Sequence, residues 1–189
     1  MIKIIEKNHQ DLEDYSKIPM RFKRETIYHV NVINQGLGGF LLEEVTGDNK
    51  MHDPSFGEGP GKWKKMFDIK NWRIFIAYDK DLPVGGIALA YQTKGCNRLE
   101  GKDDLIVVWD LRVHPDYKAQ GIGKRLMNQA DAFAKEVKAS QIKVETQNNN
   151  TNACKFYASQ GYTLGEVNRF AYRDAPEESM FIFVKNIMV

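Results

Sequence analysis

The chain has 189 residues, of which 42% are hydrophobic and 28% charged, with a formal net charge of +2. These values are typical of one globular domain, so we expect a single domain over residues 1–189. The near balance of charge excludes a field strong enough to bind nucleic acid by itself. Short basic clusters at residues 21–24 and 62–65 are expected to be solvated faces.

The first 71 residues are expected to hold a strand, helices and a loop. Residues 2–5 form a short apolar run typical of a strand. Helical periodicity between about residues 9 and 35 stops at the Gly-rich segment 36–39. Residues 52–61 are rich in Gly and Pro, which predicts an exposed loop.

From residue 72 onward the hydrophobic pattern becomes regular. Apolar runs separated by turn residues predict strands, and one segment with apolar residues at helical spacing predicts a long helix. In chain order these are strands 72–78, 83–91 and 105–113, helix 122–137, strand 141–146, helix 152–160, and C-terminal strands 162–173 and 180–185. This order predicts an α/β fold of the α+β type, with a central mixed, twisted sheet of six to seven strands flanked by about four helices.

Cysteine and histidine usage favours a reduced protein without a metal site. Two cysteines are too few for a disulfide framework, and the four histidines show no metal-ligand spacing. The N-terminus lacks the apolar stretch of a signal peptide, and no run has the length of a membrane span. We therefore predict a cytoplasmic protein with no metal, no nucleic acid and no membrane as a partner.

The turn between residues 114 and 124 is the first candidate site. A strand ends before Pro115, and Gly121-x-Gly123 then opens the long helix. The unpaired N–H groups of a helix start, together with the helix dipole, favour a bound phosphate. A strand-to-helix turn can also need glycine only for its backbone angles, so both interpretations remain open for the turn alone.

Three motifs occur in order along the second half of the chain. They are Leu111-x-Val113-x-Pro115, Lys118-x-x-Gly121-x-Gly123 and Asn150-x-x-Ala153-x-x-Phe156-Tyr157-x-x-x-Gly161. Together they resemble the GNAT superfamily of acetyl-CoA-dependent N-acetyltransferases, most clearly over residues 72–165. The resemblance implies a single GNAT-like domain with acetyl-CoA as cofactor, in which residues 1–71 lie on the substrate side.

The resemblance also implies which residues contact acetyl-CoA. Backbone N–H groups of the glycine-rich turn would hold the pyrophosphate, and the backbone of the preceding strand would pair with the pantetheine arm. Lys118 stands where the family usually has Arg or Gln, which keeps a positive charge but loses the planar fork. The implied cofactor-binding positions are Leu111, Arg112, Val113, Lys118, Gln120, Gly121, Ile122, Gly123, Lys124, Asn150, Ala153 and Tyr157.

Three residues are candidates for the chemical step. The resemblance implies that Tyr157 protonates the departing CoA thiolate, because a phenol with a pKa of about 10 keeps its proton at neutral pH. The alternative is an aromatic core residue. Asp110 and Glu145 are candidates for the base that deprotonates the amine and for a pair that binds a cation. Alternatively, Asp110 pairs with a neighbouring arginine or caps a backbone group, and Glu145 faces solvent.

A narrower resemblance concerns the amine substrate. Segments 109–113, 145–148 and 168–174 are similar to the streptothricin acetyltransferases, which acetylate an amine on the β-lysine part of a cationic antibiotic. A polycationic substrate requires carboxylates and aromatic faces along its path. The implied substrate-binding residues are Tyr91, Trp109, Asp110, Glu145 and Tyr172. For each of the aromatic residues, plain core packing is the alternative.

The activity that we expect is acetylation of a small cationic amine, most directly streptothricin, as a means of antibiotic resistance. A related enzyme that acetylates a polyamine, another antibiotic or a peptide or protein amine is the first alternative. A noncatalytic acyl-CoA-binding module is the second. The chain is expected to be a monomer or a homodimer.

Overall fold

The computed structural model describes residues 1–9, 12–54 and 59–187. Backbone contacts divide the chain into two units. The first unit comprises Met1–Arg21, Asp53–Lys143 and Asn186–Val189, and the second comprises Phe22–His52 and Val144–Lys185. Among the described residues, no helix combines the length and the apolar content that crossing a membrane requires.

An antiparallel sheet forms the centre of the first unit. Its strands are β1 (Ile2–Lys7), β6 (Arg73–Asp79), β7 (Leu82–Tyr91) and β8 (Leu105–Val113), in the order β1-β6-β7-β8. Strands β6 and β7 are buried at nearly every position rather than at every second one. Such continuous burial indicates that both faces of the sheet are covered.

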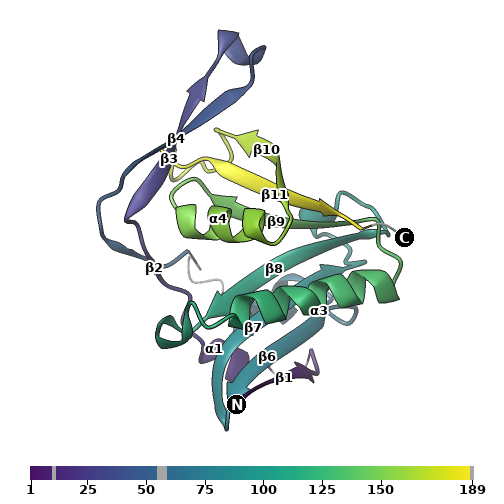
Figure 1. Cartoon of the computed structure of the whole chain (residues 1–189). Coiled ribbons are helices and arrows are strands. Elements are labelled where there is room, and N and C mark those ends of the chain that lie inside the picture. Colours follow the sequence, from purple (N-terminus) through teal and green to yellow (C-terminus); the bar gives the residue numbers. More distant parts are fainter. Residues whose placement is uncertain (10–11, 55–58, 188–189) are drawn as a thin grey trace. The chain divides into compact units, whose positions relative to one another are not determined.

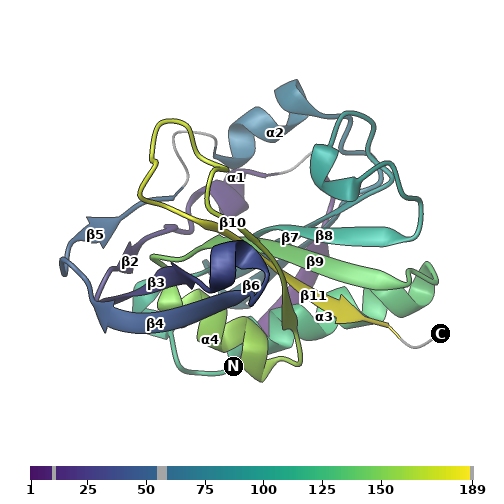
Figure 2. The same ribbon diagram turned by 90° about the horizontal axis from the view of Figure 1, so that it is seen from above.

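Helices cover the two faces of this sheet. Figure 2 shows α1 (Glu13–Ser16) and α2 (Pro60–Met66) on one side of β7 and β8, and α3 (Ile122–Glu136) on the other. The helices approach the sheet so closely at two adjacent glycines of β7 that there is no room for a side chain. A Cβ on Gly85 would lie 2.9 Å from the Ile122 side chain of α3, and one on Gly86 would lie 2.5 Å from Tyr15 of α1.

Aromatic rings fill the core between the sheet and the short helices. Tyr15 of α1 is fully buried and meets Trp63 of α2 edge-on, with ring centroids 5.4 Å apart. Trp72, directly before β6, packs against Trp63 with ring centroids 5.7 Å apart. These large side chains compensate for the short helices, because each aromatic ring buries far more area than an aliphatic side chain.

Strand β8 contains a bulge at its middle. Ala88 of β7 faces Asp110, whereas the next residue, Leu89, faces Val108, so Trp109 is the extra residue. A bulge of this kind bends a strand and redirects the side chains around it. It lies beside the residues predicted to form the site.

The second unit combines β-ribbons with a helix. Strands β3 (Thr26–Val32) and β4 (Phe40–Thr46) form a long antiparallel ribbon, which in Figure 1 extends away from α4 (Thr151–Ser159). A smaller ribbon joins β2 (Phe22–Lys23) and β5 (Met51–His52). The remaining strands follow the order β9-β11-β10 and are β9 (Gln141–Gln147), β11 (Met180–Asn186) and β10 (Thr163–Asn168).

Side-chain contacts attach the β3–β4 ribbon to the rest of this unit. Thr26 and Thr151 share a hydrogen bond of 2.8 Å between their hydroxyls, and Lys155 forms an ion pair with Glu44 at 2.7 Å. The Tyr28 backbone N–H donates to the carbonyl of Asn148 over 2.8 Å. Helix α4 therefore packs against the ribbon through specific polar contacts.

The structure confirms the predicted fold class. The described residues contain a main sheet with the strand order β1-β6-β7-β8-β9-β11-β10 and four α-helices. The long amphipathic helix appears as α3, whose buried face includes Leu126, Ala130 and Phe133. That the whole chain is one domain stays a prediction.

The N-terminal third is where the sequence-based assignment was wrong. Instead of helices between residues 9 and 35, the structure has the one-turn helix α1 followed by β2 and β3. The β-branched and aromatic residues of 26–32 favour a strand, and pairing with β4 outweighs the weak helical periodicity. Residues 55–58 of the expected loop lie outside the described residues, and its last residues begin α2.

Candidate active site

The glycine-rich turn leads from β8 into α3 through a short 3₁₀ segment, Pro115–Tyr117. Ala119 and Gly121 have positive φ values of 60° and 76°. Within the described part of the chain, no side chain caps the start of α3, and no atom lies within 4 Å of the position that a Cβ of Gly121 would occupy. The first N–H groups of α3 are therefore accessible to an anion, and the turn fits a pyrophosphate.

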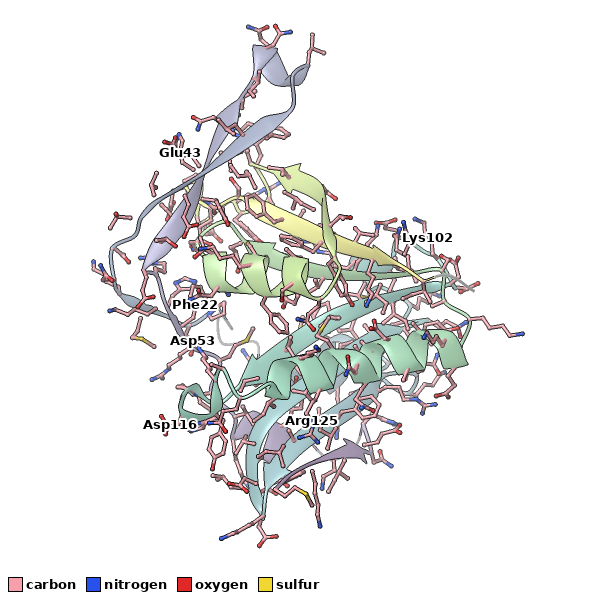
Figure 3. All side chains as sticks on the ribbon, viewed as in Figure 1. Phe22, Glu43, Asp53, Lys102, Asp116 and Arg125 are labelled. Carbon is pink, nitrogen blue, oxygen red and sulfur yellow. The ribbon has the colours of Figure 1, made fainter. Side chains whose placement is uncertain are left out.

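The polar side chains of this turn contact neighbouring backbone. Lys118 Nζ donates to the carbonyl of Arg21 over 3.2 Å, and Gln120 Nε2 donates to the carbonyl of Asp116 over 3.2 Å. Figure 3 labels Asp116 on the turn and Arg125 on the helix that follows. Ile122 is the first residue of α3 and its side chain is buried, so only its backbone can contribute to an anion site. Lys118 lies at the entrance to the turn.

The end of β8 supplies the other predicted cofactor contacts of the first unit. Leu111 and Val113 pair with Ile87 and Gly85 of β7, and both are half-buried. They lie just beyond the Trp109 bulge, between it and the glycine-rich turn. The cofactor-binding positions that the resemblance implies in β8 and in the glycine-rich turn therefore lie on one continuous stretch of backbone.

Asp110 is engaged in a buried ion pair. Arg112 donates through Nε to Asp110 Oδ1 at 2.8 Å and through Nη2 to Oδ2, and the Tyr15 hydroxyl donates to Oδ1 at 2.8 Å. The side chains of Arg112 and Asp110 are only 6% and 7% exposed. Burial opposes the charge of Arg112, but the hydrogen bond and charge of Asp110 outweigh it and raise the pKa of the guanidinium. The alternative noted for Asp110, pairing with an arginine, is the arrangement observed.

Arg112 also ties this pair to the segment after α1. Its Nη1 donates to the carbonyl of Ile18 over 3.0 Å. The Arg112 side chain is therefore engaged inside the protein, so any contact of Arg112 with acetyl-CoA would be made by its backbone. The bidentate geometry explains why arginine stands here, because only a planar guanidinium can engage both carboxylate oxygens and a third acceptor.

Two of the predicted substrate-binding aromatics lie on opposite faces of the sheet. Trp109 packs against Phe67 and Trp72 at 5.1 and 5.5 Å, in the core formed with α1 and α2. Tyr91 packs edge-on against Phe133 of α3 at 5.6 Å, and its hydroxyl accepts a hydrogen bond from Gln92. The structure therefore does not bring these two residues together, and both take part in core packing.

In the second unit, Tyr157 lies in an aromatic cluster. It is 6% exposed, and its ring contacts those of Phe156, Tyr162 and Phe183 at centroid distances of 5.5, 6.2 and 5.9 Å. A phenol in such surroundings has little water near it. Both interpretations of Tyr157, a proton donor and a core aromatic, are compatible with this position.

Asn150, another of the predicted cofactor-binding residues, lies at the start of α4. Asn150 is the N-cap, and its side-chain oxygen accepts the N–H of half-buried Ala153 over 3.2 Å. This local role accounts for an asparagine without any ligand. Cys154, one turn later, is buried, and burial raises the pKa of its thiol to about 12. The thiol is therefore protonated at neutral pH, as expected for a small core residue rather than a nucleophile.

Glu145 and Tyr172 are brought together by the structure. The Tyr172 hydroxyl donates to Glu145 Oε1 over 2.7 Å, and both side chains are half-buried. Glu145 projects from β9, and Tyr172 lies in the segment after β10. This pair joins two of the five predicted substrate-binding residues, which are 27 positions apart in the sequence.

The structure also reveals a cavity of about 590 Å³ in the first unit that sequence reasoning missed. Its lining includes Met20, Arg21, Asp53, Lys62 and Arg112. Arg21 forms an ion pair with Asp53 over 3.6 Å. The two basic clusters expected to be solvated faces thus each place one residue on the wall of this cavity. No spacing signal could have linked residues so far apart in the chain.

Comparison with known proteins assigns the chain to a family. The sequence profile of the Acetyltransferase (GNAT) family matches residues 49–162. Streptothricin acetyltransferase of Streptomyces lavendulae is 26% identical over 170 residues, 89% of this chain and 85% of that protein. Streptothricin acetyltransferase A of Bacillus subtilis (strain 168) is 34% identical over 70 residues, 37% of this chain and 40% of that protein.

Solved structures extend the likeness to the whole fold. A nourseothricin acetyltransferase superposes with a TM-score of 0.76 at 24% identity, over 99% of both chains. A candidate streptothricin acetyltransferase of Bacillus anthracis str. Ames, solved with acetyl coenzyme A, superposes with a TM-score of 0.77 at 23% identity, over 98% of this chain and 99% of that one. With more than half of its length matched by the family profile, this chain belongs to the GNAT family of acetyltransferases.

Proposed function

We propose that the chain transfers the acetyl group of acetyl-CoA directly to an amine of a small cationic substrate of the streptothricin type. The observation that carries this proposal is the uncapped start of α3 behind Gly121, an open anion site at the position where the family motif binds a pyrophosphate. The similarity to the Streptomyces lavendulae enzyme over 89% of the chain supports the choice of substrate. Acetylation of such an antibiotic would confer resistance.

Acetyl-CoA supplies an activated acetyl group as a thioester. The backbone N–H groups of Gln120, Gly121, Gly123 and Lys124 would hold its pyrophosphate, with Lys118 contributing charge. Leu111 and Val113 would align the pantetheine arm through their backbones, and Asn150 would bind it through its side-chain amide. In this arrangement the protein holds the co-substrate mainly by backbone, which agrees with the open space around Gly121.

Two proton transfers are required during the reaction. We assign Tyr157 to deliver a proton to the departing thiolate, since its aromatic surroundings limit access of water. Glu145, hydrogen-bonded by Tyr172, is the better candidate for accepting the amine proton. Asp110 is less suited, because Arg112 and Tyr15 already engage its carboxylate. We therefore assign Asp110 to positioning β8.

We further propose that the two units form one acetyltransferase domain of a cytoplasmic protein. The chain passes between the units at four points, after Arg21, His52, Lys143 and Lys185. The family profile spans residues from both units. Such interleaving is unusual for independent domains, which are joined by few connections. We expect a monomer or a homodimer, which a measurement of the molecular mass in solution distinguishes.

The decisive experiment measures release of free CoA thiol from acetyl-CoA in the presence of streptothricin, spermidine or a short peptide. We expect turnover with streptothricin. Activity with spermidine alone would favour the alternative enzyme. Binding of acetyl-CoA by calorimetry without turnover of any amine would contradict the enzyme proposal and favour a noncatalytic acyl-CoA-binding module.

A further inference from the structure

Buried polar side chains of the second unit gather in two short segments. One segment runs from the end of β9 to the first residue of α4, and the other directly precedes β11. The side chains, all buried, are those of Thr146, Asn148, Asn149, Thr151, Glu178 and Ser179. Concentrating so many polar groups in one part of a small core is costly unless each one has a partner.

Most of this cluster is well paired. Asn148 donates through Nδ2 to the carbonyl of Tyr28 over 2.9 Å and accepts the N–H of Ser179 over 2.8 Å. Its own N–H donates to the carbonyl of Ser179 over 3.0 Å. Thr151 is paired with Thr26. These bonds hold the two segments side by side and make the cluster a rigid support.

Two acceptor atoms are exceptions. Asn149 Nδ2 donates to Glu178 Oε1 over 2.7 Å, which leaves Glu178 Oε2 and Asn149 Oδ1 to be satisfied. Both atoms are buried, and neither has a hydrogen-bond donor among the described residues. Glu178 is 5% exposed and Asn149 is 4% exposed. No ion pair between Glu178 and a described lysine, arginine or histidine offsets the carboxylate charge.

A buried carboxylate without a cation can be stabilised in two ways. A proton on Oε2 could donate to Asn149 Oδ1, which would make a neutral pair. Alternatively, a ligand could bring the missing donors and the missing positive charge together. A primary ammonium group has three N–H donors and one positive charge, so it satisfies both acceptors and the carboxylate at once.

The position of the pair favours the ligand. Asn149 immediately precedes Asn150, the N-cap of α4, for which a cofactor contact is proposed. Tyr157 lies on the same helix, about 9 Å along its axis from Thr151. The unpaired acceptors therefore lie at the N-terminal end of α4, beside the residue proposed to contact the pantetheine arm.

We propose that the Glu178 carboxylate, oriented by Asn149, binds a protonated amine of the substrate through charge-assisted hydrogen bonds. This inference rests on the proposed function and names the residue that selects a cationic substrate. Glu178 acts in recognition, and the proton transfers remain with Tyr157 and Glu145. The class of ligand is a primary alkylammonium group, as found in streptothricin and in polyamines.

The test compares Glu178→Gln with Glu177→Gln, which removes the same charge from the exposed neighbouring residue. For Glu178→Gln we expect the KM for streptothricin to rise about 10- to 100-fold, the range expected when one charge-assisted contact is lost. The KM for acetyl-CoA should stay within about twofold of wild type, as should both constants in Glu177→Gln. Calorimetric titration with streptothricin in the presence of CoA should show the same loss of affinity without relying on turnover.

The variant Glu178→Asp separates recognition from a structural role. A cation-binding carboxylate should retain more streptothricin affinity as Asp than as Gln, because Asp keeps the charge. A neutral pair with Asn149 should instead prefer Gln, whose amide can donate to Asn149 Oδ1. Wild-type KM together with an unchanged or higher Tm in Glu178→Gln would overturn the proposal. Failure of Glu178→Gln to fold would also overturn it, because the charge would then serve the fold.

Failure of this inference is distinguishable from failure of the proposed function. If wild-type protein acetylates no amine in the panel and binds none, the proposed function fails. If wild-type protein acetylates streptothricin and Glu178→Gln does so with unchanged constants, only the role of Glu178 fails.

Discussion

Asp110 in the first unit and Glu178 in the second are both buried carboxylates, but their surroundings differ in kind. Asp110 accepts hydrogen bonds from the guanidinium of Arg112 and the hydroxyl of Tyr15. Glu178 accepts one from Asn149 and has a second oxygen without a donor among the described residues. Both oxygens of Asp110 accept hydrogen bonds from the protein, whereas one oxygen of Glu178 can still accept hydrogen bonds from a ligand. The number of hydrogen-bond donors around each carboxylate thus distinguishes the structural role of Asp110 from the substrate-binding role proposed for Glu178, which burial alone does not.

The strongest test of this contrast breaks the Asp110 pair. Arg112→Met should destabilise the protein by about 3–5 kcal/mol, because it leaves a buried carboxylate without its cation. Denaturant-induced unfolding measures the change. The double variant Asp110→Leu/Arg112→Met should recover most of the loss, because a neutral pair of similar volume replaces the ions. Equal destabilisation in the single and double variants would contradict the structural assignment.

Tyr157→Phe tests the proton donor among the aromatic residues of the second unit. We expect turnover to fall about 100-fold, the lower end of what general acid catalysis contributes, with affinity for acetyl-CoA nearly unchanged. Steady-state kinetics and calorimetry measure the two quantities. Tyr162→Phe is the matched control, since it removes a hydroxyl from a buried ring in the same cluster and should retain turnover. Wild-type turnover in Tyr157→Phe would remove its assigned role.

Gly121→Ala tests the anion site of the first unit. The φ of 76° at this residue makes a side chain unfavourable by about 1–2 kcal/mol, and relief of that strain would reorient the first N–H groups of α3. We expect the KM for acetyl-CoA to rise about tenfold, in line with the loss of one favourable contact to charge. Gly95→Ala, at a φ of 82° and also in open space, should lose similar stability but keep the KM. Equal KM values in the two variants would contradict the site.

Cys154 gives the smallest expected effect. Burial raises the pKa of its thiol from 9.0 to about 12, so the folded protein holds this proton more tightly than the unfolded chain. The resulting stabilisation is complete below pH 9 and is lost as the pH rises from 9 towards 12. At pH 8 the native thiol should react with iodoacetamide far more slowly than in denaturant, as measured by mass spectrometry. Fast labelling of the native protein would contradict this assignment.

Local signals were sufficient for much of the chain from residue 72 onward. The apolar positions of α3 have helical spacing, and most residues of β6 to β8 are β-branched, aromatic or small, so these elements formed where expected. Ordered motifs indicated the glycine-rich turn in the same way. The N-terminal third was different, because the strand β3 depends on pairing with β4, a contact between residues up to 20 positions apart.

The sequence by itself determined the family, the fold class, and the glycine-rich turn with Gly121 at its helix start, because these depend on local backbone preferences and on motifs in order. Only the tertiary structure decided which side chains meet. It paired Asp110 with Arg112 and Tyr15, joined Glu145 to Tyr172 and separated Tyr91 from Trp109. It also left one Glu178 oxygen without a donor from the residues that the structure describes. The physical reason is that a carboxylate's role depends on donors supplied by distant segments, and spacing along the chain does not encode which segments those are.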